Sequence, residues 1–132
     1  PEGGAIQHTD EPVVKAVAKS PEDRVRMGKA TFAQNCAACH QPDGKGIAGA
    51  FPPLAGSDFL NADKKRAIGI VKNGKSGEIT VNGTKFNGVM PAQNLSDEDI
   101  ANVLTYVYSA WGNSKKVVTP ADVRGVKGPE KK

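Results

Sequence analysis

The residues best suited to chemistry lie together in the short string Cys36-Ala-Ala-Cys39-His40. A C-x-x-C-H string is an attachment pattern for covalently bound, c-type haem. Two thiols at this spacing add across the two vinyl groups of one porphyrin, and the imidazole of the next residue then lies under the iron. The string therefore predicts one covalent haem c, with His40 as an axial iron ligand.

The same cysteine pair also suits other chemistry. A structural zinc ion needs four ligands, but besides the two thiols the chain has only His8 and His40. A thioredoxin-like redox pair belongs among alternating strands and helices, and the sequence lacks this alternation. We expect His8 to lie in a solvent-exposed linker rather than at a metal. Haem attachment is the favoured interpretation.

Met90 is the candidate for the second axial iron ligand. It lies between Gly88 and Pro91 in a turn-like segment rather than on an apolar stripe, and it follows His40 by 50 residues, enough chain to pass around a porphyrin. The alternative for a lone methionine is a filler of the core. Met27 is too near the cysteine pair to reach the opposite face of the ring. A thioether ligand favours the ferrous state, which suits electron transfer.

The Pro52-Pro53-Leu54 segment is a candidate support for His40. A backbone carbonyl in this segment can accept the proton of the second imidazole nitrogen, which fixes the ring and strengthens its donation to a metal. The alternative is a rigid loop, which the same prolines would form without any such role. Phe32 and Trp111 are expected to be contacts between helices rather than redox relays.

Capping and turn signals predict the elements that position these residues. Ser20 and Ser96 each precede acidic residues, as helix starts do. Gly28 lies on the apolar stripe of the first helix, so we expect another backbone to pack closely there. The expected elements are a helix over 21–35, a loop over 41–57, a short helix capped by Asn61 or Asp63 and ending before Gly74, a hairpin over 78–87 around Asn82-Gly83, and a last helix ending at Gly112.

Composition and charge set the expected domain boundaries and exclude some functions. We expect a linker over 1–20, one globular domain over 21–113 and a basic, solvated tail over 114–132, which has six basic and two acidic residues. The nearly neutral middle and the lack of aromatic residues in the tail argue against nucleic acid binding. No apolar run is long enough to span a membrane. Leu, Ile, Val and Phe make up only about 20% of the chain, so a cofactor is expected to complete the core.

With these motifs together, the sequence resembles a class I c-type cytochrome over residues 21–113. The resemblance rests on Gly28, Phe32, the C-x-x-C-H string, the Pro52-Pro53-Leu54 turn, the Gly88-Val89-Met90-Pro91 segment and the aromatic last helix. It implies an all-α bundle around one covalent haem, with a short β-hairpin before the methionine loop. It also implies that the first and last helices cross at Gly28, that the Pro52 carbonyl is the partner of His40, and that the protein is periplasmic.

A narrower likeness concerns NGVMPAQ at 87–93 and VLTYVYSAWGN at 103–113, followed by VTPADV. These strings are similar to the cytochrome domain fused behind the cupredoxin domains of haem-containing copper nitrite reductases. The likeness implies a domain without turnover of its own that donates electrons to a copper centre in denitrification. Its partner would be the fused cupredoxin domains or a separate redox protein, because this chain has no further ligands for copper.

Three alternatives remain open at this point. The same strings are similar to cytochrome domains of quinoprotein dehydrogenases and of haem-copper oxidases, and the chain also suits a free-standing soluble cytochrome. A haem sensor or enzyme with an open iron position is less favoured because Met90 is available to close it. Pro1 is a poor residue after a signal-peptidase cut, which favours a start inside a longer protein.

Overall fold

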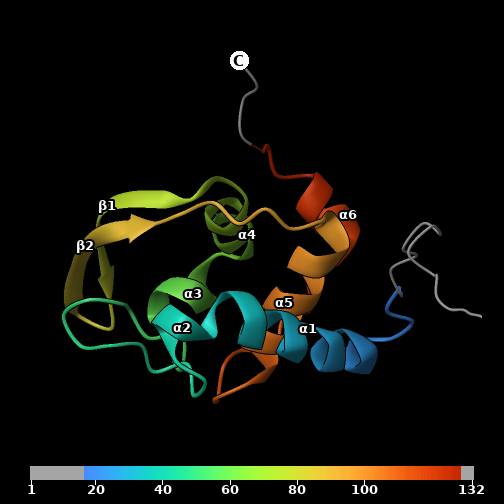
Figure 1. Ribbon diagram of the computed structural model, residues 1–132, viewed down its shortest axis with the longest axis horizontal. Helices are drawn as coiled ribbons and strands as arrows, with labels where there is room; N and C mark the ends of the chain where they lie inside the picture. Colours follow the sequence, from blue (N-terminus) through green and yellow to red (C-terminus); the bar gives the residue numbers. More distant parts are fainter. Residues whose placement is uncertain (1–16, 129–132) are drawn as a thin grey trace, which may run out of the picture.

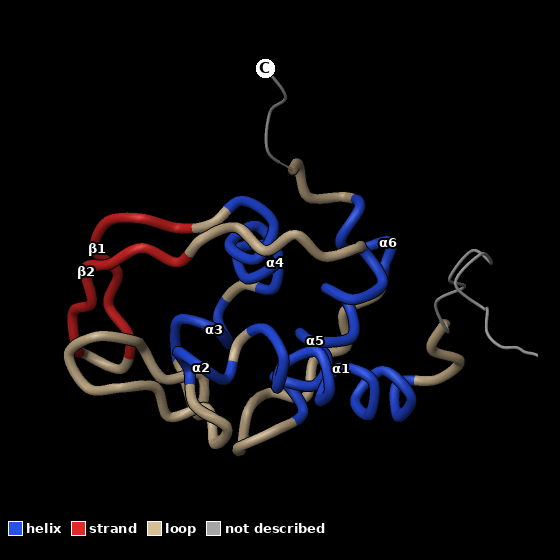
Figure 2. The backbone as a smooth tube through the Cα atoms, in the orientation of Figure 1, coloured by secondary structure: helices blue, strands red, loops and turns tan. Residues whose placement is uncertain are grey.

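Two crossing helices, α1 (Pro21–Asn35) and α5 (Asp97–Ser109), form the centre of the fold. The structure is a computed structural model that describes residues 17–128. Figures 1 and 2 show the helices gathered at one end and a two-stranded hairpin at the other. The remaining elements are α2 (Ala37–His40), α3 (Asp58–Ala62), α4 (Lys64–Asn73), β1 (Lys75–Val81), β2 (Thr84–Met90) and α6 (Pro120–Arg124).

The helix starts follow the capping signals in the sequence. The Ser20 hydroxyl accepts from the backbone N–H of Asp23 at 3.1 Å, and the Ser96 hydroxyl accepts from that of Asp99 at 3.1 Å. Asp63, rather than Asn61, caps α4. These side chains satisfy backbone donors that a helix N-terminus leaves without partners.

The crossing of α1 and α5 depends on a missing side chain. A Cβ atom at Gly28 would lie 1.9 Å from the backbone oxygen of Asn102, so only glycine allows this approach. Beside the crossing, Nη1 of Arg24 donates to Glu98 at 3.0 Å and to the Asn102 side chain at 2.9 Å. The close packing expected at Gly28 is confirmed.

The hairpin is antiparallel and turns at Asn82-Gly83, as expected from the sequence. Both turn residues have positive φ, 51° and 83°, which a two-residue turn of this kind requires. The strands are longer than predicted and cover 75–90 instead of 78–87. Met90 is therefore the last residue of a strand and not part of a free turn.

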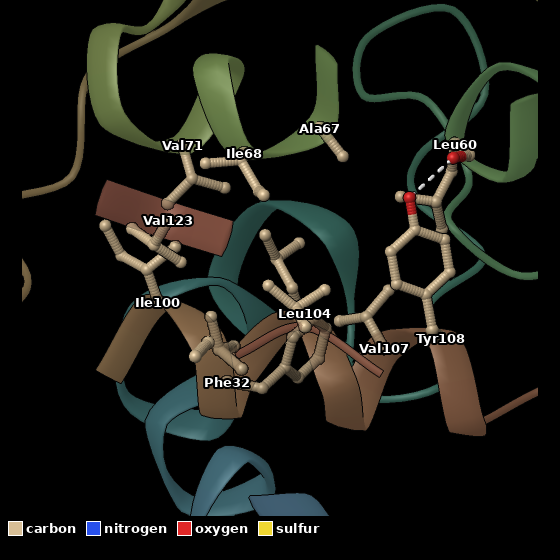
Figure 3. Close-up of a cluster of buried hydrophobic side chains, with 13 residues drawn as sticks. Phe32, Leu60, Ala67, Ile68, Val71, Ile100, Leu104, Val107, Tyr108 and Val123 are labelled. Atoms are coloured by element: carbon tan, nitrogen blue, oxygen red, sulfur yellow. Dashed lines mark hydrogen bonds between the residues drawn. The ribbon is translucent and has the colours of Figure 1, made fainter. Parts of the chain in front are cut away.

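The core lies between α4, α5 and Phe32 near the end of α1 (Figure 3). Ile68 and Val71 from α4 face Ile100 and Leu104 from α5. The hydroxyl of Tyr108 is buried and donates to the Leu60 carbonyl at 2.8 Å, so its burial leaves no donor unsatisfied. The expected architecture, mostly helical with one hairpin, is confirmed. Among the described residues, no helix is long and apolar enough to span a membrane.

The C-terminal segment differs from its prediction. The prediction of a solvated tail over 114–132 is wrong for residues 114–128, because Val118 and Val123 are fully buried against α4 and α5. The backbone of Val118 both donates to and accepts from the Thr105 hydroxyl, at 2.9 and 3.0 Å. Basic residues of the neighbouring helix hold the segment: Lys64 pairs with Asp122 at 3.0 Å, and Lys72 donates to the Val123 carbonyl at 2.8 Å.

The predicted N-terminal linker is also partly ordered. Ala18 is buried, and its backbone N–H donates to the Glu98 carboxylate at 3.1 Å. The linker prediction is therefore too long at its C-terminal end. Residues 1–16, including His8, lie outside the described residues.

Shortening Val123 tests whether the C-terminal segment belongs to the core. We expect Val123→Ala to lower the free energy of unfolding by about 2 kcal/mol, because two buried methyl groups are lost and a small cavity remains. The matched control is Val117→Ala, in the same segment but 38% exposed, which should cost about 0.5 kcal/mol or less. Denaturant unfolding measures both; equal, negligible effects would mean that the segment is not part of the core.

Candidate haem-binding site

The C-x-x-C-H string forms a single helical turn. The backbone N–H groups of Cys39 and His40 both donate to the Cys36 carbonyl, at 3.2 and 2.9 Å. Residues three and four positions apart lie on one face of a helix. Both thiols and the imidazole therefore belong to the same side of α2, which explains why the haem-binding pattern needs this spacing.

The orientation of His40 is fixed by a backbone group. Its Nδ1 atom lies 3.0 Å from the Pro52 carbonyl oxygen. Because a carbonyl can only accept, Nδ1 carries the proton and Nε2 keeps a free lone pair. Burial lowers the pKa of His40, and the bond to Pro52 only partly opposes this effect. The ring is therefore held neutral, in the form that binds metals.

The loop between α2 and α3 brings Pro52 to this position. The Gly46 N–H donates to the His40 carbonyl at 2.9 Å, and the Leu54 N–H donates to the Gly44 carbonyl at 2.6 Å. Gly46 has a φ of 67°, and a Cβ atom there would lie 2.2 Å from the Phe51 oxygen. Glycine is therefore required where the loop folds back on itself.

The electrostatics of Cys36 disfavour the alternative cysteine chemistries. Burial, with a smaller effect from Cys39, raises the pKa of the Cys36 thiol to about 11. A redox-active cysteine needs a lowered pKa instead. Within residues 17–128, no group of three or more Cys, His, Asp or Glu side chains could hold a metal ion.

The hairpin forms one wall of a cavity above these residues. Alternate residues of the two strands line the cavity, as the two-residue period of a strand requires. The facing pairs on this inner side are Lys75 with Met90, Gly77 with Gly88, and Ile79 with Phe86. The other side is polar apart from Val89, which is 72% exposed and still reaches the cavity at its rim.

Met90 is brought to the cavity by a close approach of two backbones. Gly74, with a φ of 80°, would place a Cβ atom 2.8 Å from the Met90 oxygen, so a side chain there would push the strand away. Just beyond Met90, the Gln93 N–H donates to the Val71 carbonyl at 2.8 Å. Met90 is half-buried and packs against the core.

The lining of the cavity suits a large apolar group. Its volume is about 250 Å³, and α1, α4, α5, the hairpin and the loop before α3 contribute mostly apolar lining residues. The structure brings together all six residues expected at the site, namely Cys36, Cys39, His40, Pro52, Leu54 and Met90. Met27 is not among the lining residues. The donor set, two thiols with one imidazole and one thioether, matches what a covalent haem requires.

Some lining residues were missed by the sequence analysis. Ile79, Val81 and Phe86 line the cavity from the hairpin, and their alternation with polar residues was the signal that could have placed them there. Phe32 also lines the cavity, and its ring lies 5.6 Å from Tyr106 and 5.5 Å from Trp111. These ring contacts join α1 to the end of α5, which supports the structural role expected for Phe32 and Trp111.

A helical shell around an apolar cavity, with a C-x-x-C-H turn on one wall and a methionine on another, defines a small haem-binding electron-transfer protein. The sequence matches the family Cytochrome c over residues 25–111. The chain therefore belongs to the cytochrome c family. Its cofactor is covalent haem c, and its activity is electron transfer.

Individual relatives agree with this assignment. The chain is 47% identical to cytochrome c-552 of Thermus thermophilus over 95 residues, which are 68% of this chain and 72% of the relative. It is 32% identical to the cytochrome c subunit of a quinone alcohol dehydrogenase from Gluconacetobacter polyoxogenes, covering 73% of this chain and 21% of that subunit. It is 35% identical to a cbb3-type cytochrome c oxidase subunit of Rhizobium meliloti, covering 72% and 30%.

Replacing the cysteines tests their part in the attachment. Acidified organic solvent should leave the haem with the wild-type polypeptide, because thioether bonds survive this treatment. Cys36→Ala and Cys39→Ala should each retain one thioether and one free vinyl group, which shifts the α band of the reduced pyridine complex to longer wavelength. The double variant should release its haem. Haem that leaves the wild-type protein would contradict the assignment of the two thiols.

Proposed function

We propose that Cys36 and Cys39 form the two thioether bonds to haem and that His40 and Met90 are the axial iron ligands. The Pro52 carbonyl holds the imidazole of His40, and Leu54 contributes to the apolar wall. The supporting observation is that the two thiols, the imidazole and the thioether line one cavity. No other methionine lines it.

The bound group supplies a one-electron ferric–ferrous couple. The chain adjusts this couple in two ways. The Pro52 carbonyl accepts from Nδ1 of His40 and so strengthens donation from Nε2. The thioether of Met90 favours the reduced form, and the apolar wall excludes water from both ligands.

A site closed on both sides by protein ligands suits a carrier better than an enzyme. His40 and Met90 occupy both axial positions in this proposal, so no position is left for a substrate. Among the described residues there is also no second cluster of metal ligands. We therefore propose that the chain has no turnover of its own and serves as an electron-entry or electron-transfer domain.

The partner class favoured by the comparisons is a quinoprotein dehydrogenase or a terminal oxidase. The relatives include subunits named for both classes, although this chain spans only 21% and 30% of the two described above. The cavity rim, where Val89 is 72% exposed and Ala50 is also exposed, is the surface proposed for partner approach. A small apolar patch of this kind suits a transient encounter.

The copper centre of a nitrite reductase remains a prediction from sequence strings alone. No relative described above is a nitrite reductase. We therefore place it second, after the dehydrogenase and oxidase classes. The periplasmic location also remains a prediction.

Replacing Met90 tests the axial ligand. We expect Met90→Ala to open one iron position, so that the reduced protein binds carbon monoxide readily and the reduction potential falls. The oxidised variant should also lose the weak near-infrared band of a sulfur ligand. Met27→Ala, on α1 away from the cavity, is the control and should change neither property. A wild-type protein that binds carbon monoxide as fast as Met90→Ala would overturn the assignment.

Mixing experiments test the partner class. The oxidised protein should be reduced by a quinoprotein alcohol dehydrogenase and its alcohol, and the reduced protein should be reoxidised by a cbb3-type oxidase with oxygen. Stopped-flow absorbance measures both rates. The same reoxidation rate is measured with a copper nitrite reductase core and nitrite in place of the oxidase and oxygen. Faster oxidation by that core than by the oxidase would reverse the order of the two candidates.

A further inference from the structure

Lys75 is the only charged side chain among the residues that line the cavity. It begins β1, faces Met90 across the hairpin and belongs to the inner side of the sheet together with Gly77 and Ile79. This side is otherwise apolar. A cation at the rim of an apolar cavity indicates a ligand whose body is apolar and whose edge carries negative charge.

The contacts of the Lys75 ammonium group differ from those of Lys72 in the same part of the fold. Within residues 17–128 the Lys75 group makes neither a hydrogen bond nor an ion pair, whereas Lys72, three residues earlier, donates to two carbonyls at the end of the chain. No Asp or Glu of the described part of the chain lines the cavity. The ammonium group of Lys75 is therefore able to form an ion pair with a bound ligand.

The other polar side chains around the cavity are already engaged. Asn35 donates to the Thr31 carbonyl at 3.0 Å, and Gln93 donates to the Pro91 carbonyl at 2.9 Å. The Ser57 hydroxyl accepts from a helix N–H at 3.0 Å. Lys75 is thus the lining group best able to neutralise an ionised carboxylate.

We propose that Lys75 binds a propionate carboxylate of the haem, a step that rests on the site proposed above. The porphyrin carries its vinyl groups and its propionates on opposite edges. The vinyl edge is assigned to α2 by the thiols, and Figure 1 shows the junction of α4 and β1, where Lys75 begins the strand, well apart from α2. The carboxylates therefore lie toward Lys75.

This pairing has a defined effect on the iron. An ionised carboxylate near the iron favours the ferric form, because the ferric centre carries one more positive charge. Pairing with Lys75 neutralises that carboxylate and so raises the reduction potential. Lys75 acts through the propionate and is a positioning residue; it is not an iron ligand.

The test compares Lys75→Met with Lys85→Met in the holoprotein. Lys85 lies on the same hairpin and faces Thr80 on the outer side, so it controls for the loss of one positive charge. Lys75→Met should lower the reduction potential and shift the carboxylate bands in the redox infrared difference spectrum. Lys85→Met should leave the carboxylate bands unchanged and move the potential less. Lys75→Arg should keep the wild-type spectrum and potential.

Two results would overturn the proposal. Equal shifts of the reduction potential in Lys75→Met and Lys85→Met would mean that Lys75 acts only as a distant positive charge. Unchanged carboxylate bands in Lys75→Met would exclude direct binding of the propionate. Failure of the underlying site is distinguishable, because it would appear in the wild-type protein as haem without thioether bonds or without a methionine ligand.

Discussion

The structure depends on the apolar cavity between α1, α5 and the hairpin. Segments far apart in the sequence contribute its walls, from Phe32 to Val107. The hairpin turns its mostly apolar side to this cavity and its mostly polar side outward. Because the chain has few branched and aromatic residues, we expect burial of the porphyrin surface to supply much of the hydrophobic stabilisation that the side chains do not.

Backbone contacts rather than side-chain size position the two proposed iron ligands. Glycine is required at the helix crossing, in the loop that carries Pro52 and beside the Met90 backbone, because a Cβ atom at Gly28, Gly46 or Gly74 would lie between 1.9 and 2.8 Å from a backbone oxygen. Each contact fixes one wall of the cavity. The positions of His40 and Met90 therefore depend on these close backbone approaches.

The cofactor was easier to predict from the sequence than the boundaries of the domain and of the strands. The C-x-x-C-H string, the caps at Ser20 and Ser96 and the Asn82-Gly83 turn are local signals, and each acts through contacts a few residues away. The segment after Asn113 was predicted to be a solvated tail because its composition is basic. Its two buried valines could not be recognised from composition, since their burial depends on distant partners in α4 and α5. The inner residues of the hairpin, including Lys75, could be placed only once the strand register was known, since a shift of one residue reverses the sides.

The central claim is that haem completes the core of this domain. Thermal unfolding of the Cys36→Ala, Cys39→Ala chain without haem, followed by circular dichroism beside the holoprotein, tests it most directly. We predict a broad, non-cooperative loss of helix in the haem-free chain and a cooperative transition in the holoprotein. A cooperative transition of the haem-free chain near the temperature of the holoprotein would contradict it.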